Sequence, residues 1–498
     1  MLNSNGRNIR ALIVDLNNFA RYPTIAVGYL SSVLRGHGVD VTVLSPLAHD
    51  VSGVTREPRE TRLINVGRRI SYTLNQMPGV LTDKARSLIN KARTHIGSRH
   101  YPKISDLFDA AQPADFDVVL VSTYLMYYPV CREIGLICDQ VGVPLLIGGS
   151  YFSEREVAQS WLDLPGLHAI IGGEVEFEIA AILGTAIERG DLSRFDGVWL
   201  PDGRGRNRKP LQTLDKISFP DYSDFPWDKY PHRIIPMVTG RGCGWGACTF
   251  CSDVTSTAGR TYRSRSPANV LQEAEYQSKR LGTSLFVFVD LKLNSDGPVW
   301  QAITSQLAER VHNPSWIGSI HVGSKDPNGL DLESLKRARK SGAVRLTTGL
   351  ESGSQRVLDQ WAKGTELGVT SRFLHDAAEA GISIRVTMIH GAPDERPEDV
   401  DASADFLNRH RRLIDRVSLN RFQFMIGPTF QRRHDEKPSR NPSIIVGERQ
   451  PRMATADHRM VNSPTRKYFL ATQRLLSAVH AINKKKLPDN ASVFEGVM

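Results

Sequence analysis

The first part of the chain alternates strand-length apolar runs with helix-length amphipathic segments. Residues 11–15 form an apolar run that ends in Asp15 and predict a buried strand. Residues 26–35 repeat apolar positions with a helical period and end at Gly36, and residues 39–44 are again strand-like. This order predicts a βαβ unit.

The strand signals resume after residues 50–101, a basic insertion without a clear pattern. Three further apolar runs, at 117–122, 144–148 and 168–172, each end in a small residue or a glycine. Because ligands of open parallel sheets bind beyond the carboxyl ends of the strands, these ends outline a crevice.

A proline-rich connector at 217–227 separates this region from a second α/β series. Helices are expected from Pro267 and over 370–380, and a last amphipathic helix over 467–484 follows a weakly patterned stretch. The expected strands of the second series are 233–238, 284–289, 317–321, 343–350, 384–389 and 416–424. Such βα repeats predict a partial barrel, whose active site lies on the face where the strands end.

The pattern therefore predicts an α/β protein with two principal domains. A Rossmann-like (flavodoxin-like) domain is followed by a partial (β/α)6 barrel and a small C-terminal helical extension. The expected boundaries are 1–215 for the first domain, 216–232 for a linker, 233–427 for the barrel and 428–498 for the extension.

Composition and charge narrow the classes of partner. The chain has 498 residues and a net charge of +10, with local basic excess at 56–99 and 409–452. We interpret the basic residues as solvated faces that suit an anionic substrate or a cofactor phosphate, and we expect no nucleic acid partner. No secretory signal or membrane-length apolar span is visible, and cysteines are few, so we expect a cytoplasmic protein without a membrane partner.

Cys243, Cys248 and Cys251 lie within nine residues on a glycine-rich stretch. A closed zinc site or a fully ligated iron–sulfur cluster takes four protein ligands, so three thiolates leave one coordination position open for chemistry. The intervening glycines let the backbone wrap around a bulky group. Zinc held with a distant histidine is the alternative. Cys131 and Cys138 lie in an apolar, helix-like stretch and indicate packing.

Several segments together resemble one known family. They are Thr239-Gly-Arg-Gly-Cys243, Cys248-Thr-Phe-Cys251, Thr348-Gly-Leu-Glu-Ser-Gly-Ser354, Lys363-Gly-Thr365 and Gly391-Ala-Pro. The chain resembles the radical S-adenosylmethionine (SAM) enzymes that carry an N-terminal cobalamin-binding domain. The resemblance implies a [4Fe-4S] cluster on Cys243, Cys248 and Cys251, with SAM on the fourth iron. One departure is the four residues between Cys243 and Cys248, where three are usual.

The resemblance also implies a set of SAM-binding residues. Phe250 would border the adenine, Glu351 and Ser352 would contact the amino and ribose groups, and Arg385 would lie near the carboxylate. Asp290 and Gly391 occupy further family positions. A carboxylate accepts hydrogen bonds from an ammonium or a ribose diol, which fits Glu351 independently. The alternative for Glu351 is a structural ion pair with Arg345 or Arg385.

For cobalamin, the resemblance points to loops at the strand ends of the first domain, whose glycines would let backbone amides approach the corrin. The implied residues are Tyr22, Gly28, Ser122, Thr123, Tyr124, Gly148, Gly149, Ser150, Gly172, Gly173 and Glu174. No Asp-x-His-x-x-Gly sequence is present, so no protein histidine is expected as the lower cobalt ligand. The alternative is a flavodoxin-like domain that binds nothing.

The implied activity is reductive cleavage of SAM to a 5'-deoxyadenosyl radical, which abstracts hydrogen from an unactivated carbon of a small-molecule substrate. Cobalamin would then supply a methyl group, which makes a C-methyltransferase the leading hypothesis. Cyclisation or rearrangement without methyl transfer is the nearer alternative, and a non-catalytic α/β binding protein is an alternative of another class. The resemblance implies flavodoxin or ferredoxin as electron donor. The residues identify no catalytic acid or base.

Overall fold

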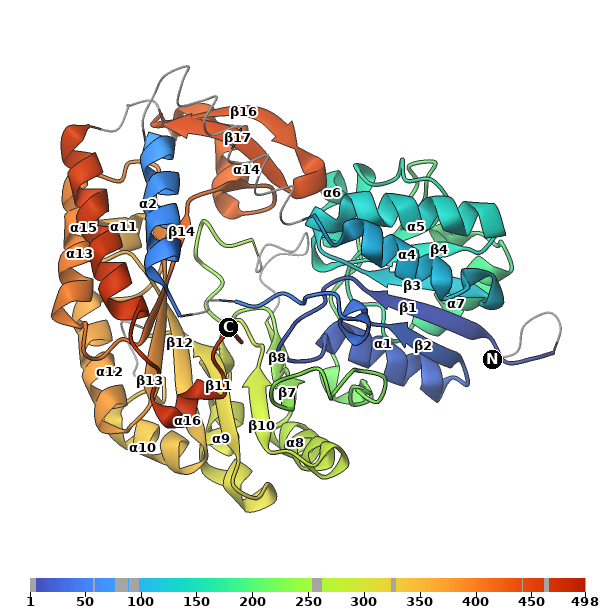
Figure 1. The fold of residues 1–498 in the computed structure, drawn as a ribbon, viewed down its shortest axis with the longest axis horizontal. Helices are drawn as coiled ribbons and strands as arrows, with labels where there is room; N and C mark the ends of the chain where they lie inside the picture. The colour runs from blue at the N-terminus through green and yellow to red at the C-terminus, as the bar shows by residue number, and fades with distance from the viewer. Residues whose placement is uncertain are drawn as a thin grey trace.

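The computed structural model describes residues 6–56, 59–76, 88, 98–252, 262–323, 328–440, 442–460 and 465–497. Two α/β bodies lie side by side, and a small antiparallel sheet with one helix lies above the space between them (Figure 1). The predicted fold class is confirmed.

The first body is built on a six-stranded sheet in the order β2-β1-β3-β4-β5-β6, parallel except for β6 at the edge. Its strands are β1 (Arg10–Asp15), β2 (Asp40–Leu44), β3 (Val118–Ser122), β4 (Leu145–Gly148), β5 (Leu167–Ile171) and β6 (Val198–Trp199). Strand order reverses between β1 and β3, and this switch point is where open α/β sheets bind ligands. All of the predicted strands of this domain are present.

Helices cover both faces of this sheet. Helices α1 and α7 pack on one face, whereas α4, α5 and α6 pack on the other. Their bounds are α1 (Ile25–Gly36), α4 (Tyr101–Ala110), α5 (Tyr128–Val141), α6 (Arg155–Gln159) and α7 (Ile179–Ile187). Pro129 stands in the first turn of α5, where its missing N–H costs no intrahelical hydrogen bond.

The second body is a six-stranded parallel sheet in the order β7-β10-β11-β12-β13-β14, which is the predicted partial barrel. Its strands are β7 (Ile234–Met237), β10 (Leu285–Phe288), β11 (Ser315–Ile320), β12 (Ala343–Glu351), β13 (Ser383–His390) and β14 (Arg416–Arg421). The expected strand 416–424 was too long. The chain leaves the barrel after Arg421, and β15 (Phe424–Met425) pairs with a different sheet.

Alternation along the barrel strands divides their side chains between two layers. Ile235, Phe286 and Trp316 pack against the outer helices, whereas Ile234, Val287, Ile317 and Val344 form an inner cluster. The outer helices are α8 (Pro267–Leu281), α9 (Gly297–Arg310), α10 (Leu332–Lys340), α11 (Gln355–Gln360), α12 (Leu367–Glu379) and α13 (Pro397–Arg409). Phe494 and Val497, near the end of the chain, join the inner cluster.

The C-terminal region contains more than the predicted helix. The helix is α15 (Arg466–Asn483), and a β-hairpin and two short helices accompany it. These are β16 (Ile444–Gln450), β17 (Thr455–Met460), α14 (Thr429–Glu436) and α16 (Asp489–Ser492).

Arginines of this C-terminal region contact the first body. Arg432 pairs with Glu154 at 3.6 Å, and Arg449 pairs with Glu156 at 2.9 Å. The Arg-rich stretch therefore joins two parts of the chain.

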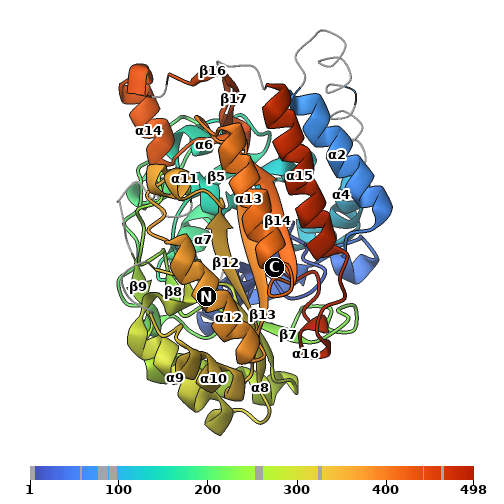
Figure 2. The ribbon, with the colours of Figure 1, turned by 90° about the vertical axis from the view of Figure 1, so that its left-hand side faces the viewer.

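The insertion at 50–101 contains α2 (Arg62–Gln76), which sequence patterning missed. This helix lies alongside α15 in Figures 1 and 2, away from the sheet that precedes it. The Tyr72 hydroxyl donates to the Leu419 carbonyl of β14 at 3.1 Å, and Arg69 donates to Gln473 at 2.9 Å. Packing thus crosses the expected boundary between residues 1–215 and the barrel.

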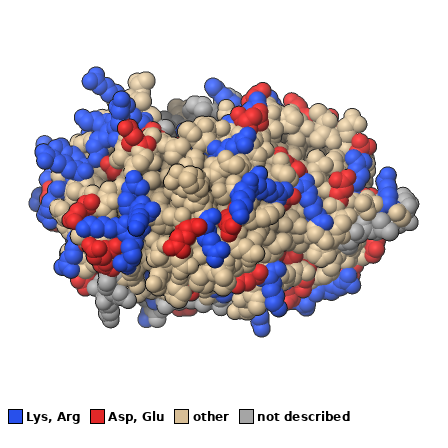
Figure 3. Space-filling view, turned by 90° about the horizontal axis from the view of Figure 1, so that it is seen from below, with Lys and Arg blue, Asp and Glu red and all other residues tan. Residues whose placement is uncertain are grey.

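On the face shown in Figure 3, Lys and Arg are interleaved with Asp and Glu and gather toward one end. Among the helices of the described ranges, none combines the length and apolar character needed to cross a membrane.

Candidate functional site

The cysteine segment is the connection of a short hairpin at the edge of the barrel. Strand β8 (Gly240–Arg241) pairs antiparallel with β9 (Arg263–Ser264). Gly242 and Gly246 have positive φ angles of 84° and 53°, which lets the chain turn sharply on either side of Gly244. Residues 253–261 of this connection lie outside the described ranges.

The extra residue between Cys243 and Cys248 is accommodated by an anchored tryptophan. The Trp245 indole N–H donates to the Ala362 carbonyl at 2.9 Å, and its ring stacks on His321 with centroids 5.7 Å apart. A Cβ on Gly364 would lie 2.1 Å from this ring, so only glycine fits beneath it. The segment therefore bulges around Trp245 and is not loose.

Asp290 fixes the start of the cysteine segment. Its buried carboxylate accepts hydrogen bonds from the Thr239 N–H at 3.0 Å, the Thr239 hydroxyl at 2.7 Å and the Gly240 N–H at 2.9 Å. Burial raises its pKa to about 6, and these hydrogen bonds oppose that rise. Its observed contacts are those of a positioning residue for the cysteine segment.

The cysteine segment also pairs with loops from the opposite part of the barrel. Thr249 donates to the Trp361 carbonyl at 3.0 Å and accepts from the Phe430 N–H at 2.8 Å. The Phe250 ring lies 5.0 Å from the Trp361 ring, in a cluster that includes Ala392. Phe250 and the segment after Gly391, both predicted to border SAM, are thus brought together.

Glu351 ends β12 in an uncommon backbone conformation. Its φ is 57°, and the register of β12 against β13 shifts beside it. Residues held at such angles cluster at functional sites because the surroundings must enforce them. The carboxylate pairs with the Lys363 ammonium at 3.0 Å. Its ion-pair partner is thus Lys363, where the sequence suggested Arg345 or Arg385.

Lys363 also connects Glu351 to the thiols. Its Nζ lies 5.9 Å from the Phe250 ring centroid. Burial raises the pKa of the Cys248 thiol, whereas the charge of Lys363 lowers it. A cation here favours the thiolate that metal binding requires.

Two further residues predicted to contact SAM are Ser352 and Arg385. Ser352 is fully buried, its hydroxyl lying 3.3 Å from the Ser403 hydroxyl and accepting from the Ser354 N–H. Arg385 is the third residue of β13, level with Thr347. At 3.3 Å per residue it lies about 16 Å before the end of the strand.

Gly391 follows β13 with a φ of 81°, and its N–H donates to Glu395 at 2.8 Å. The Tyr468 hydroxyl donates to the same carboxylate oxygen at 2.5 Å. Burial raises the pKa of Glu395 to about 7 and lowers that of the neighbouring His390 to about 4. Near neutral pH, His390 is therefore uncharged.

Because of Glu395, we expect the free energy of unfolding to depend on pH. Because its folded pKa of about 7 lies above the ordinary 4.5, the folded state holds the proton more tightly, and stability falls as pH rises through this window. The loss amounts to about 3 kcal/mol. Glu395→Gln cannot ionise and should remove this part of the slope in denaturant unfolding between pH 4.5 and 8. A slope in Glu395→Gln equal to that of the unaltered protein would contradict the assignment.

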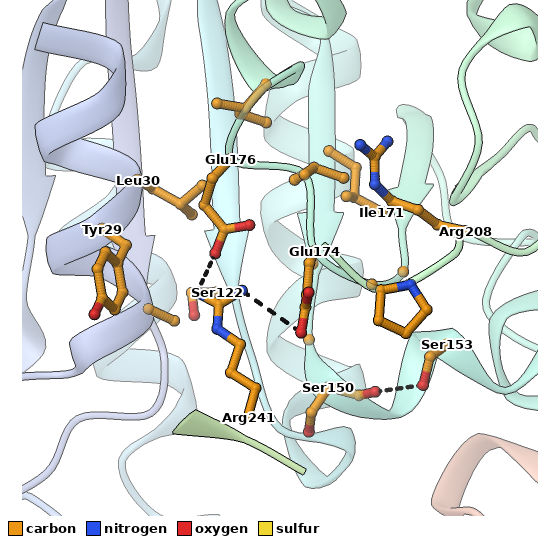
Figure 4. Close-up of a pocket in the computed structure, with 18 of the residues that line it drawn as sticks. Tyr29, Leu30, Ser122, Ser150, Ser153, Ile171, Glu174, Glu176, Arg208 and Arg241 are labelled. Carbon is orange, nitrogen blue, oxygen red and sulfur yellow. Dashed lines mark hydrogen bonds and ion pairs between the residues drawn. The ribbon is translucent and has the colours of Figure 1, made fainter. Parts of the chain in front are cut away.

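A cavity of about 480 Å³ lies at the strand ends of the first body. Figure 4 shows its lining from β3 and from the loops after β4 and β5, with α1 at one side. Of the residues predicted for cobalamin, those that line it are Ser122, Gly148, Gly149, Ser150, Gly172, Gly173 and Glu174. Cys243 and Arg241 line the same cavity, so it extends from the first sheet to the cysteine segment.

The other residues predicted for cobalamin do not line this cavity. Thr123 and Tyr124 are outside the lining, and Tyr22 joins the inner cluster of the barrel. Gly28 lies against the linker, since a Cβ there would be 2.6 Å from Tyr222.

Two of the lining glycines serve the loops themselves. A Cβ on Gly149 would lie 2.5 Å from the Thr123 carbonyl oxygen, and one on Gly172 would lie 2.0 Å from that of Phe152. These glycines permit close approach of backbone to backbone, in addition to any approach of a ligand.

Sequence reasoning named Glu174 but missed the other charged side chains of this cavity. Arg241 pairs with Glu176 at 2.5 Å, and Arg263 pairs with Glu174 at 2.6 Å. Arg208 also lines the cavity (Figure 4). Arg241 lies inside a quoted segment and Glu174 is one of the residues implied for cobalamin, but the pairing of these charges depends on how the two bodies meet.

Two basic side chains lie at the strand ends of the barrel near the cysteine segment. Lys292, after β10, is 9% exposed, and within the described residues it faces the Cys243 thiol and no carboxylate. His321, after β11, is buried, and its Nε2 has no hydrogen-bond partner within the described ranges. Burial, followed by the charges of Lys363 and Lys292, lowers the pKa of His321 to about 3.

The donor set of the cysteine segment fits a cluster. Cys243, Cys248 and Cys251 are each partly exposed, whereas Cys131 and Cys138 are buried in α5. Among the described residues, no three ligating side chains converge as a single zinc ion would need. A four-iron cluster instead takes each thiolate on a different iron.

Comparisons with known proteins agree with this geometry. Residues 237–407 match the family model of the radical SAM superfamily. The chain is 26% identical over 318 residues to an uncharacterized methyltransferase of Pyrococcus horikoshii, covering 61% of this chain and 67% of the relative. It is 27% identical over 253 residues to an anaerobic magnesium-protoporphyrin IX monomethyl ester cyclase of Rubrivivax gelatinosus, covering 48% of this chain and 44% of the cyclase. The second match thus spans less than half of that enzyme.

Among solved structures, the chain resembles the radical S-adenosylmethionine methyltransferase TsrM of Kitasatospora setae, determined with cobalamin and a [4Fe-4S] cluster bound. The TM-score is 0.63 at 15% identity, covering 90% of this chain and 85% of TsrM. Residues 237–407 therefore carry the sequence pattern of the radical SAM superfamily, and the chain shares its fold with a structure that was determined with cobalamin bound.

Proposed function

We propose that the protein is a cobalamin-dependent radical SAM methyltransferase that acts on an unactivated carbon of a small molecule. One observation carries this proposal: the cavity at the strand ends of the first body is lined by Cys243. A ligand in that cavity would lie next to a cluster on the cysteine segment. We assign residues 1–215 to cobalamin binding and residues 233–427 to the radical SAM barrel.

The residues at the cysteine segment fit a [4Fe-4S] cluster and SAM. Cys243, Cys248 and Cys251 would hold three irons and leave the fourth for SAM. Glu351 and Lys363 would provide an acceptor and a donor for its amino and carboxylate groups, and Phe250 an apolar surface for its adenine. These cofactors supply the radical and the methyl group, while the protein binds and orients them.

The first body offers polar groups and glycine-bearing loops that suit cobalamin. Its lining combines glycine-bearing loops with the hydroxyls of Ser122 and Ser150. Backbone amides and hydroxyls are suitable partners for the amide groups around a corrin. TsrM, which has this fold, was solved with cobalamin bound, and that supports the assignment.

Methyl transfer is favoured over ring formation by the methyltransferase names of a curated relative and of TsrM. Cyclisation remains the second candidate because of the matched cyclase.

We also propose an anionic group on the substrate. It would meet Lys292, the buried ammonium at the mouth of the barrel that no described carboxylate pairs with. The arginines at 432 and 449 are engaged with Glu154 and Glu156. An acidic flavodoxin or ferredoxin would supply the electrons.

The experiment is anaerobic incubation of the holoenzyme with reductant, candidate substrates and SAM labelled with deuterium in its methyl group. We expect a product heavier by one labelled methyl in place of hydrogen, together with 5'-deoxyadenosine. A product with unchanged carbon count would favour cyclisation or rearrangement. Absence of 5'-deoxyadenosine with every substrate, despite a full cluster, would contradict hydrogen abstraction.

A further inference from the structure

Two arginines face each other across the hairpin that carries the cysteines. Arg241 of β8 is the direct cross-strand partner of Arg263 of β9. Like charges directly opposite each other on a sheet are destabilising. Glu174, from the loop after β5, lies between them at 2.6 Å from Arg263 and 3.6 Å from Arg241. The first body thus neutralises a repulsion at the base of the cysteine segment.

Glu176 also contacts Arg241, and only one of its two carboxylate oxygens takes part in this contact. One of its oxygens accepts from Arg241 at 2.5 Å, whereas Oε2 is buried and has no hydrogen-bond partner among the residues that the structure describes. Glu176 is 9% exposed and lines the cavity. A buried carboxylate oxygen without a donor is costly, so the site is suited to a ligand that brings an N–H or O–H group.

We propose that Glu176 and Arg241 couple the ligand of the cavity to the metal centre. This inference rests on the proposed function, in which the ligand is cobalamin, whose corrin carries primary amides that can donate to Glu176 Oε2. Arg241 stands two residues before Cys243, so a donor that orders Glu176 also orders the start of the cysteine segment. Both are positioning residues.

Coupling of this kind is reciprocal. If an ordered cysteine segment strengthens corrin binding by some factor, corrin binding strengthens ordering of the segment by the same factor. Couplings between sites typically amount to about 5- to 150-fold in affinity. The protein with its cluster should therefore bind hydroxocobalamin at least about fivefold more tightly than the protein without it.

The test is an anaerobic absorbance titration with hydroxocobalamin of protein before and after cluster reconstitution. In the unaltered protein we expect the two dissociation constants to differ at least about fivefold, and in Glu176→Gln to become nearly equal. Arg241→Lys keeps the charge but not the fork that reaches two carboxylates, and should also reduce the ratio. The matched control is Glu178→Gln, which breaks a pair with Arg208 that does not reach the hairpin.

The outcomes separate this inference from the proposed function. If the protein binds hydroxocobalamin but Glu176→Gln and Arg241→Lys keep the original ratio, the coupling is overturned while the cofactor assignment stands. If the unaltered protein binds no corrinoid, the proposed function itself fails. Iron content and circular dichroism of each variant show whether it folded, and Arg241→Lys carries the test if Glu176→Gln does not fold.

Discussion

Replacing Cys243, Cys248 and Cys251 by alanine should abolish iron and sulfide incorporation and reduce SAM cleavage to background. Each thiolate holds one iron of the proposed cluster, and alanine offers no ligand in its place. Metal analysis and detection of 5'-deoxyadenosine after anaerobic reconstitution measure the two effects. Formation of 5'-deoxyadenosine by the triple variant would sink the cluster assignment.

The chain contains its own control for this experiment. Cys138 is buried in α5 of the first body, and burial raises the pKa of its thiol to about 12. Such a thiol is a packing group and a poor metal ligand. Cys138→Ala should therefore keep the iron content per folded molecule, even if packing is weakened.

Asp290→Asn should release the start of the cysteine segment. The carboxylate accepts from two N–H groups and one hydroxyl, whereas an amide turns one acceptor into a donor that faces a donor. A buried hydrogen bond to a charged group contributes about 1.5–3 kcal/mol, so the segment should be ordered roughly 10- to 150-fold less often. When iron and sulfide are limiting, the fraction of this variant that gains a cluster should fall. An excess of iron and sulfide should partly restore that fraction.

The control here is Asp331→Asn. Asp331 caps the N-terminus of α10, accepting from the Ser334 N–H at 3.0 Å, and asparagine caps helices about as well as aspartate. It removes the same charge without touching the cysteine segment. Equal reconstitution of the Asp290 and Asp331 variants would show that Asp290 has no special role.

Much of the fold was predictable because its strands are buried on both faces. Strands β3 and β7 are entirely buried, and such runs stand out from their neighbours as continuous apolar stretches. The hairpin β16–β17 was missed for the opposite reason. Most residues of β16 are exposed, so its sequence shows neither a continuous apolar run nor clean alternation.

Helix α2 was missed because its apolar residues do not mark its buried side. Leu63 is 85% exposed and Val66 52% exposed, whereas the packed face includes Ser71 and Tyr72. A periodicity argument assumes that apolar positions face the core, and here that assumption fails.

For the site, the motifs located the cysteines and Glu351 but not the partners that hold them. Lys363 as the partner of Glu351 comes from the next loop of the barrel, and Glu174 as the partner of Arg263 joins segments 89 residues apart. Gly28 illustrates the converse error, since its motif indicated a ligand loop while the glycine serves contact with Tyr222. Motifs identify chemistry, whereas the fold decides which groups meet.

The position of α2 also has a consequence for how the protein is made. Tyr72 leaves the ribosome 347 residues before its partner Leu419. At about 5–20 residues per second, the helix waits roughly 20–70 s for the strand that it covers. During that time the side chains that later face α15 are exposed to solvent, as Leu63 and Val66 still are in the complete fold. Tyr72, which is buried in the complete fold, therefore stays in contact with solvent until β14 is synthesised.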